Sequence, residues 1–342
     1  MTRPTLNEIA STTGVSAGTV SRVLNGRMAG RISERTRKLV LDAANEAGYR
    51  PNAAARSMLE GRTRTIGIVF HNDGHGRDAH PHTFEFVVGI NSVLEPAGYT
   101  SALVQLTDVE SDTYGMGRVF REHALDGMIV LAPLIKPVRE ALGNLVQWLI
   151  WCDAGKRDST GCLWRDEVAA GRLAGEAMVA AGYRRLIFIR SHVDGRRAYH
   201  HAQEREHGVR AAAEAAGVPF ETLAFDHEAV SGWHGLPEAA AGGAAVIASD
   251  YPHVLELHAA AAASGIVLGR DCGFASCDDL DLFRRFYPNL PRAGFDRAEM
   301  GKRAADMMLE RIKHPDGDAS LPSFISQPTW LAGTVPAGPT NT

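Results

Sequence analysis

A short run near the start of the sequence combines hydroxyl side chains with one arginine. The stretch "TVSRVLNG" begins at Thr19, and Ser16, Ser21, Arg22 and Asn25 lie in it or beside it. Short hydroxyl and amide groups hydrogen-bond to phosphate oxygens, and an arginine can donate two hydrogen bonds to guanine O6 and N7. These residue types therefore indicate contact with duplex DNA. A merely solvated helix face is the alternative.

The charge distribution supports the DNA interpretation. The chain of 342 residues has a formal net charge of -4, yet residues 1–64 contain 11 Lys and Arg against 5 Asp and Glu. The remaining residues contain 25 against 35. A basic end on an acidic body indicates a small polyanion-binding module joined to a larger domain, although a solvated basic face would have the same composition.

Two short helices around Gly14 must position these side chains. Thr5 and Glu8 have the spacing of a capping box, Ser16 suits the N-cap of the second helix, and Gly14 permits a sharp turn. Apolar residues of the two helices face each other, which leaves the hydroxyls and Arg22 on the outer side of the second helix. A third helix over residues 33–47 is expected to complete the core with Leu39, Val40, Ala43, Ala44 and Ala47. The pattern is typical of a helix-turn-helix domain.

The first sixty-odd residues resemble those of the lactose-repressor (LacI) family of bacterial transcription regulators. The match runs through "TLNEIASTTGVSAGTVSRVLNG" and "ISERTRKLVLDAANEAGYRPNAAARSMLEGRTRTIGIV", with a slightly long loop over residues 27–31. The resemblance implies operator binding through the second helix. The expected DNA-binding residues of this domain are Thr5, Leu6, Ser16, Ala17, Gly18, Thr19, Ser21, Arg22, Asn25, Ser33 and Thr36.

Sequence preference should depend strongly on Arg22. Ala17 and Gly18 occupy base-reading positions of the family but have almost no side chain, so direct readout there is sparse. Arg22 and the bendability of the DNA must then carry more of the specificity.

Residues 51–62, within "YRPNAAARSMLEGR", are expected to form a hinge helix. Pro51 suits a helix start, and the eight residues after it are too few to be stably helical alone. In the LacI family this segment becomes helical when two subunits sit on an operator, and its apolar residue enters the minor groove. The resemblance implies Met58 as that wedge, with Asn52, Ala55 and Arg56 contacting the groove or the backbone. A plain linker is the alternative.

From Thr65 onward, short β-rich runs such as "TIGIVF", "RLIFIR" and "AAVIAS" alternate with alanine-rich amphipathic stretches that end at glycine. This alternation predicts parallel βαβ units. The resemblance implies an α/β, two-lobed effector domain like that of periplasmic binding proteins, with doubly wound parallel sheets. The predicted domains are residues 1–50 (all-α, helix-turn-helix), 51–62 (hinge helix) and 63–342 (effector binding and dimerisation), the last with one lobe at about 65–164 plus 294–325 and another at about 165–293 plus 326–342.

Ligands of such sheets bind at the carboxyl ends of the strands, here in a cleft between the lobes. "WRDEVAAGRLAGEAM" and "AQEREHG" resemble family stretches that place Asp166 and Arg205 at the pocket, and Asp250 and Asp278 follow two further strands. Carboxylates together with one arginine can form paired hydrogen bonds with vicinal hydroxyl groups, and Trp164 is expected to stack on a sugar face. Each acid alone fits an N-cap or a surface loop equally well. Glu167, Ser249 and the run 276–279 depart from the family's usual residues.

The histidine-rich stretch "HNDGHGRDAHPHTFEF" allows two interpretations. His71, His75, Asp73 and Asp78 with the later histidines could form a metal site, but the spacing fits no ligand template. By alignment with the family, His82 and His80 are expected to contact the effector. No metal and no other cofactor is expected.

These features predict a ligand-responsive repressor of a sugar or sugar-derivative catabolic operon, acting as a cytoplasmic homodimer on double-stranded operator DNA. A nucleoside, an organic acid or no small ligand remain alternatives for the effector. The competing class is a two-lobed binding protein or enzyme without regulatory DNA binding, but neither a secretion signal nor a coherent nucleophile and base is visible. No apolar run is long enough to span a membrane, and the four cysteines are expected to be buried thiols.

Overall fold

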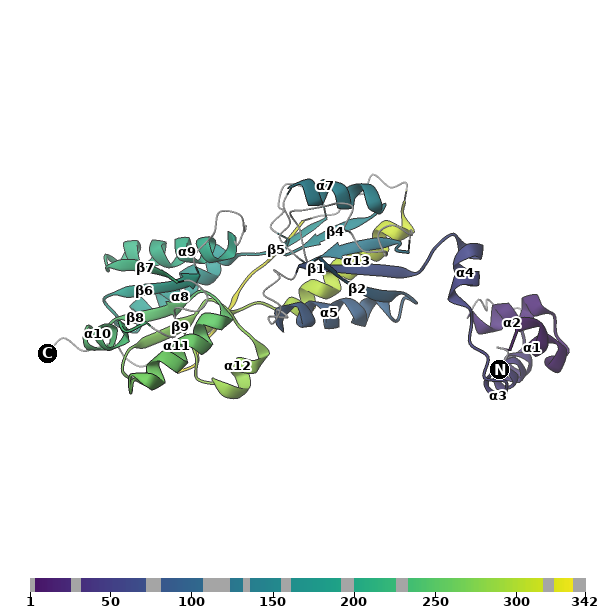
Figure 1. Cartoon of the computed structure of the whole chain (residues 1–342), viewed down its shortest axis with the longest axis horizontal. Helices are drawn as coiled ribbons and strands as arrows, with labels where there is room; N and C mark the ends of the chain where they lie inside the picture. Colours follow the sequence, from purple (N-terminus) through teal and green to yellow (C-terminus); the bar gives the residue numbers. More distant parts are fainter. Residues whose placement is uncertain are drawn as a thin grey trace. The chain divides into compact units, whose positions relative to one another are not determined.

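A computed structural model describes residues 4–25, 32–71, 81–106, 124–131, 136–154, 161–191, 200–225, 233–315 and 323–334. The chain divides into two units, Met1–Arg64 and Thr65–Thr342. The first unit is all-α and the second contains two six-stranded sheets (Figure 1). The predicted fold class is therefore confirmed.

The first unit begins with three helices, α1 (Leu6–Thr13), α2 (Ala17–Leu24) and α3 (Glu34–Glu46). Thr5 and Glu8 form the predicted capping box, and Ser16 caps α2 by accepting the backbone N–H of Thr19. Their shared core contains Ile9, Val20, Val23, Val40 and Ala43.

Two residues expected in this three-helix core lie elsewhere. Leu39 is 47% exposed, and Ala47 is exposed at the C-cap of α3. The 3.6-residue period explains the error, because Val40 and Ala43 already fill the side of α3 that meets α1 and α2.

The fourth helix, α4 (Ala53–Glu60), follows in the segment predicted as a hinge. The Asn52 side chain accepts the backbone N–H of Ala55, and Glu60 pairs with Arg64 at 2.8 Å. These two local contacts stabilise the ends of a helix that is otherwise too short to be stable alone.

One lobe of the second unit is built on a sheet with the order β11-β5-β4-β3-β1-β2, all parallel. Helices α5 and α13 pack on one face of this sheet, and α7 packs on the other. The elements are β1 (Thr65–His71), α5 (Pro81–Leu94), β2 (Thr100–Leu106), β3 (Gly127–Val130), α7 (Lys136–Leu145), β4 (Leu149–Cys152), β5 (Cys162–Arg165), α13 (Arg297–Lys313) and β11 (Phe324–Ser326).

The other lobe has a sheet with the order β12-β10-β9-β8-β6-β7, in which only the pairing of β10 with β12 is antiparallel. Helices α8 and α9 cover one face, and α10, α11 and α12 cover the other. The elements are α8 (Glu167–Ala180), β6 (Leu186–Ser191), α9 (His200–Ala216), β7 (Phe220–Phe225), α10 (Leu236–Ala241), β8 (Ala245–Ala248), α11 (Tyr251–Ala263), β9 (Gly273–Ser276), α12 (Asp281–Phe286), β10 (Arg292–Gly294) and β12 (Thr329–Leu331).

The chain passes between the lobes three times. It leaves the first sheet after β5, returns after β10 to form α13 and β11, and leaves again before β12. Because β5 is parallel to β4 and β11, and β10 is parallel to β9, the carboxyl ends of these strands bring polar residues of both lobes to the crossings.

Two other expectations are settled by the fold. All four cysteines are free and buried, as predicted. Within the described ranges, no helix is both long enough and apolar enough to cross a bilayer.

Candidate functional site

Helix α2 separates an apolar side from a polar side. Val20 and Val23 are buried against α1 and α3, whereas Ser16, Gly18 and Arg22 are exposed. The buried pair fixes the rotation of the helix, so the polar side must face away from the core. This arrangement can place hydroxyls and a guanidinium in a DNA groove.

One hydrogen bond to the backbone of α2 orients the Arg22 side chain and leaves the end of its guanidinium group accessible. Its Nε donates to the Gly18 carbonyl oxygen at 3.2 Å, and its two Nη groups have no partner in the described part of the chain. Asn25 donates to the Ser21 carbonyl at 2.8 Å and closes the helix. Arg22 therefore keeps the edge of its guanidinium that can reach guanine.

The remaining residues predicted to contact DNA differ in how exposed their side chains are. Thr5 and Ser33 are exposed N-caps, Leu6 packs against the three-helix core, and Met58 on α4 is 87% exposed. Of the others, Asn52 and Ala55 are exposed, and the half-buried members are Ala17, Thr19, Ser21, Asn25, Thr36 and Arg56.

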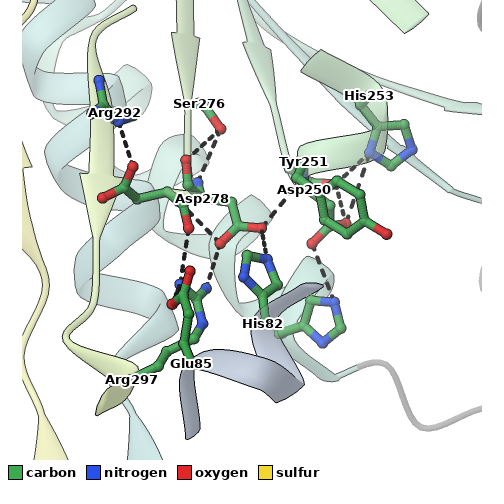
Figure 2. Close-up of polar contacts among 12 residues, drawn as sticks. His82, Glu85, Asp250, Tyr251, His253, Ser276, Asp278, Arg292 and Arg297 are labelled. Atoms are coloured by element: carbon green, nitrogen blue, oxygen red, sulfur yellow. Dashed lines mark hydrogen bonds and ion pairs between the residues drawn. The ribbon is translucent and has the colours of Figure 1, made fainter. Parts of the chain in front are cut away.

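A second cluster of polar residues lies in the two-sheet unit and centres on Asp278, which follows β9. Its Oδ1 accepts from Arg297 Nη2 at 2.6 Å and from the Asp279 N–H at 3.1 Å, and its Oδ2 accepts from the Tyr251 N–H at 3.3 Å. His82 Nε2 lies 2.8 Å from the same Oδ2 (Figure 2). His82 and Arg297 begin helices of one lobe, whereas Asp278 belongs to the other, so this carboxylate joins the two lobes.

Asp250, at the carboxyl end of β8, is the second acidic centre. Its Oδ1 accepts from Arg205 Nη1 at 2.7 Å and lies 3.2 Å from His201 Nε2. The Ser249 hydroxyl donates to Oδ2 at 2.7 Å. Asp250 is thus held on both oxygens by its own lobe, although its side chain stays 20% exposed.

The Ser249 hydroxyl fixes the direction of a hydrogen-bond chain. Because it donates to Asp250, it must accept from His253 Nδ1 at 3.2 Å, and the Ser191 hydroxyl lies 3.1 Å from Nε2 of the same ring. His253 Nδ1 lies 3.8 Å from the Asp250 carboxylate, beyond a direct hydrogen bond. These hydrogen bonds therefore orient Asp250, and they lack the direct histidine-to-carboxylate hydrogen bond of a hydrolytic triad.

Arg205 on α9 connects both acidic centres to the start of α8. Its Nε donates to Glu167 Oε2 at 2.7 Å, and its Nη2 lies 3.8 Å from Asp278 Oδ1. Glycines set this geometry: a Cβ on Gly171 would overlap the Arg205 carbonyl oxygen, and one on Gly208 would overlap that of Val168. Backbone contact between α8 and α9 thereby positions both Arg205 and Glu167.

Arg165, the last residue of β5, adds a third guanidinium. Its Nη2 lies 2.9 Å from Asp153 Oδ2 and 2.9 Å from Glu167 Oε1. Asp153 follows β4 with a left-handed φ of 58°, which is uncommon for a residue other than glycine. A neighbouring pair, Arg292 and Asp279, completes the buried network.

Electrostatics fix the charge states of the main groups. Burial lowers the pKa of His82, and the nearby Arg297 lowers it further. Burial alone would raise the pKa of Asp278, but His82, Arg297 and Arg205 hold it well below its ordinary value. Burial raises the pKa of Glu85, which lies 3.6 Å from Arg297. Asp278 is therefore an ionised acceptor facing a neutral imidazole.

The structure brings together four of the predicted effector residues: His82, Arg205, Asp250 and Asp278. Trp164 instead packs against the apolar cluster on the α7 side of its sheet, and Asp166 caps α8 by accepting the Ala169 N–H at 2.9 Å. His80 lies outside the described residues, as does most of the histidine-rich stretch. Among the described residues, no group of three or more His, Cys, Asp or Glu is arranged to hold a metal.

Sequence reasoning missed several members of the network. Asp153 stands directly after a strand, which is the same signal that pointed to Asp250 and Asp278. Nothing in the sequence singles out Arg165, because the family resemblance points to the next residue, Asp166. The other missed members are Glu85, Glu167, His201, His253, Asp279, Arg292 and Arg297, which come from the first turns of helices, a loop and the start of β10, where the sequence carries no pattern.

Family models match both parts of the chain. Residues 5–52 match the model for bacterial regulatory proteins of the lacI family, and residues 176–330 match the periplasmic binding protein-like domain. The chain is 28% identical over 332 residues to the transcriptional regulator CelR of Thermobifida fusca, covering 91% of this chain and 92% of that protein. It is 24% identical to the ribose operon repressor of Haemophilus influenzae, covering 96% and 97%.

Solved structures resemble the chain over almost its full length. The lac repressor dimer bound to operator and an anti-inducer aligns with a TM-score of 0.76 at 21% identity, covering 98% of this chain and 100% of that one. The complex of CelR with cellobiose aligns with a TM-score of 0.65 at 22% identity, covering 97% and 100%. These likenesses support the fold of both units.

Proposed function

We propose, from the premise that this chain belongs to the LacI family of bacterial regulatory proteins, that it represses a catabolic operon for a sugar or sugar derivative. In this proposal α2 reads the operator, α4 acts as the hinge helix, and the network around Asp278 and Asp250 binds the effector. The chain acts as a regulator in the cytoplasm and performs no catalysis.

The polar side of α2 carries the proposal. Its buried valines and its N-cap fix which residues face outward, and the outward set contains hydroxyls and one guanidinium on the basic part of the chain. Phosphate contacts from hydroxyls and backbone N–H groups would set the register, and Arg22 would supply base readout. The exposed Met58 on α4 suits insertion between base pairs of the minor groove.

The effector proposal depends on the network that joins the two lobes. One similar solved structure contains cellobiose and another contains ribose, and both resemble the two-sheet unit in fold. Here carboxylates and guanidinium groups gather at the strand ends in the position where such folds bind ligands. A ligand that favours one arrangement of the lobes would shift the population of DNA-binding hinges.

A homodimer would give the protein two recognition helices and hence two half-sites. Apolar side chains of the first lobe support self-association: Phe84 is 70% exposed, Val88 51% and Leu103 60%. Phe84 and Val88 lie one turn apart on α5, and α5 packs beside the edge strand β2, which contains Leu103. A second copy of this chain is the proposed partner of that patch.

The experiment uses the full-length chain and a random pool of double-stranded oligonucleotides. Selection should enrich one two-fold related sequence, and titration with cellobiose or D-ribose should change the affinity for that sequence. A chain that enriches no duplex over random sequence would refute operator binding. A chain that binds an operator but responds to none of a wide panel of sugars, nucleosides and organic acids would refute effector control.

A further inference from the structure

Four buried polar atoms have no hydrogen-bond partner among the described residues. They are His82 Nδ1, Arg165 Nε, Arg165 Nη1 and Glu167 Oε1, the last of which has only an ion-pair contact with Arg165 Nη2, at 2.9 Å and outside hydrogen-bond geometry. A buried polar atom without a partner costs about 1–3 kcal/mol, so such atoms are rare and call for an explanation. All four belong to three residues of the one network, which points to a group that binds there.

Arg165 is rigidly held with two donors to spare. Its side chain is 9% exposed, its Nη2 is shared between Asp153 and Glu167, and its guanidinium lies over the Phe295 ring at 5.3 Å. The two carboxylates and the Phe295 ring fix the plane of the guanidinium, so the N–H groups of Nε and Nη1 point in fixed directions.

His82 and Glu167 contribute acceptors to the same network. His82 Nε2 must carry the proton that binds the ionised Asp278, so the Nδ1 of the neutral ring is an acceptor. Glu167 gives Oε2 to Arg205, and its Oε1 keeps acceptor capacity next to Arg165. Arg165 also lies close enough to His82 for its charge to lower the pKa of that ring.

The mixture of donors and acceptors selects the chemistry of the ligand. A carboxylate or phosphate could accept from Arg165, but it would be repelled by Glu167 and by the lone pair of His82. An ammonium group could donate to Glu167 and His82, but it would be repelled by Arg165. Carboxylates of the network also outnumber its arginines by six to four, which disfavours a further anion. A hydroxyl both donates and accepts, so it satisfies either side.

We propose that Arg165, Glu167 and His82 form a subsite for neighbouring hydroxyl groups of an uncharged effector, and that Arg165 discriminates this effector from its acid and deoxy analogues. The inference rests on the proposed function, because it concerns the same effector site. It adds Arg165 and Glu167 to that site and states the charge of the ligand.

The test is calorimetric titration of the full-length chain with matched probes. The neutral sugars are cellobiose and D-ribose, the acids are cellobionate and D-ribonate, and 2-deoxy-D-ribose lacks one hydroxyl. At least one neutral sugar should bind, and its acid or deoxy analogue should bind at least about tenfold more weakly, because a polar group left unpaired costs about that much. Equal or tighter binding of the acid would overturn the proposal.

Two variants test whether the preference for the neutral sugar depends on Arg165. Arg165→Lys keeps the positive charge beside Asp153 and Glu167 but removes the free donors, so the affinity for the neutral sugar should fall about tenfold or more. Arg190→Lys is the matched control, because Arg190 also lies near the carboxyl end of a strand but already donates to Glu206 and to the Ser191 carbonyl. Unchanged affinity in Arg165→Lys would contradict the subsite. Should that variant not fold, the comparison of probes on the unmodified chain decides alone.

The operator titration separates this inference from the proposed function. If the chain selects an operator but binds no neutral sugar of the set, the hydroxyl subsite is wrong and the DNA-binding role stands. If the chain binds a neutral sugar with the predicted preference but selects no duplex, the subsite stands and the regulatory role is wrong.

Discussion

His82 Nε2 and Asp278 Oδ2 are 2.8 Å apart and connect the first turn of α5 in one lobe with the end of β9 in the other. The imidazole also meets the Tyr251 ring edge-on at a centroid distance of 5.3 Å. Asp278 accepts hydrogen bonds from both lobes at once, so any change in the arrangement of the lobes must break or rebuild some of them.

Removal of this imidazole should weaken the two-sheet unit. His82→Ala leaves a buried carboxylate oxygen short of one donor, which should lower the free energy of unfolding by about 1–3 kcal/mol. His82→Gln can still donate to Asp278 and should retain most of the stability. Urea unfolding of both variants measures the difference, and equal stability of His82→Ala and the unmodified chain would show that the contact contributes nothing.

The stability of this unit should also depend on pH through His82. Its pKa in the folded chain is lowered from 6.5, so below that value the unfolded chain binds more protons than the folded chain. The free energy of unfolding should therefore fall as the pH drops from about 7 towards 5.5, and it should fall less in His82→Gln, which lacks this titration. Thermal unfolding at a series of pH values tests this, and identical pH profiles would count against it.

The close backbone contact between α8 and α9 should be required for both stability and effector binding. Gly171→Ala would drive a methyl group into the backbone of Arg205, and we expect a loss of about 1–3 kcal/mol together with weaker effector binding. Gly143→Ala on α7 is the control, because a Cβ there meets nothing within 4 Å and the substitution should be neutral or slightly stabilising. Thermal unfolding compares the two, and similar midpoints would contradict the packing argument.

Charge placed on the apolar patch of α5 should disrupt self-association. Phe84→Asp puts a carboxylate on a side chain that is 70% exposed in the single chain, so the fold should persist while the dimer weakens. Light scattering at micromolar concentration should report a dimer for the unmodified chain and a smaller average mass for the variant. A monomeric unmodified chain would refute the proposed assembly.

The sequence predicts the helical head well because its signals are local. Thr5 with Glu8, Ser16 and Ser33 are caps that act within one turn, and Val20, Val23 and Val40 follow the helical period. Leu39 shows the limit, since an apolar residue beside a buried one need not itself be buried. The alternation of strands and helices likewise predicts two sheets with polar residues at the strand ends.

The details of the effector site depend on contacts between distant residues. Arg297 meets Asp278 from another lobe, and Arg165 meets Asp153 across two strands, so no local pattern could pair them. Alignment with the family predicts Asp166 at the pocket; in the structure its side chain caps α8, and its contact with an effector stays a prediction. Trp164 faces the opposite side of its strand from Arg165, because side chains alternate along a strand.

The most direct test of operator recognition compares Arg22→Ala with the unmodified full-length chain on a selected operator and on random duplex DNA at several salt concentrations. Arg37→Ala is the control, since Arg37 is an exposed arginine of the same domain that pairs with Glu34. The account predicts that Arg22→Ala loses roughly 1–3 kcal/mol of operator affinity and keeps weak, salt-sensitive binding to random DNA. Unchanged discrimination between operator and random DNA in Arg22→Ala would contradict it.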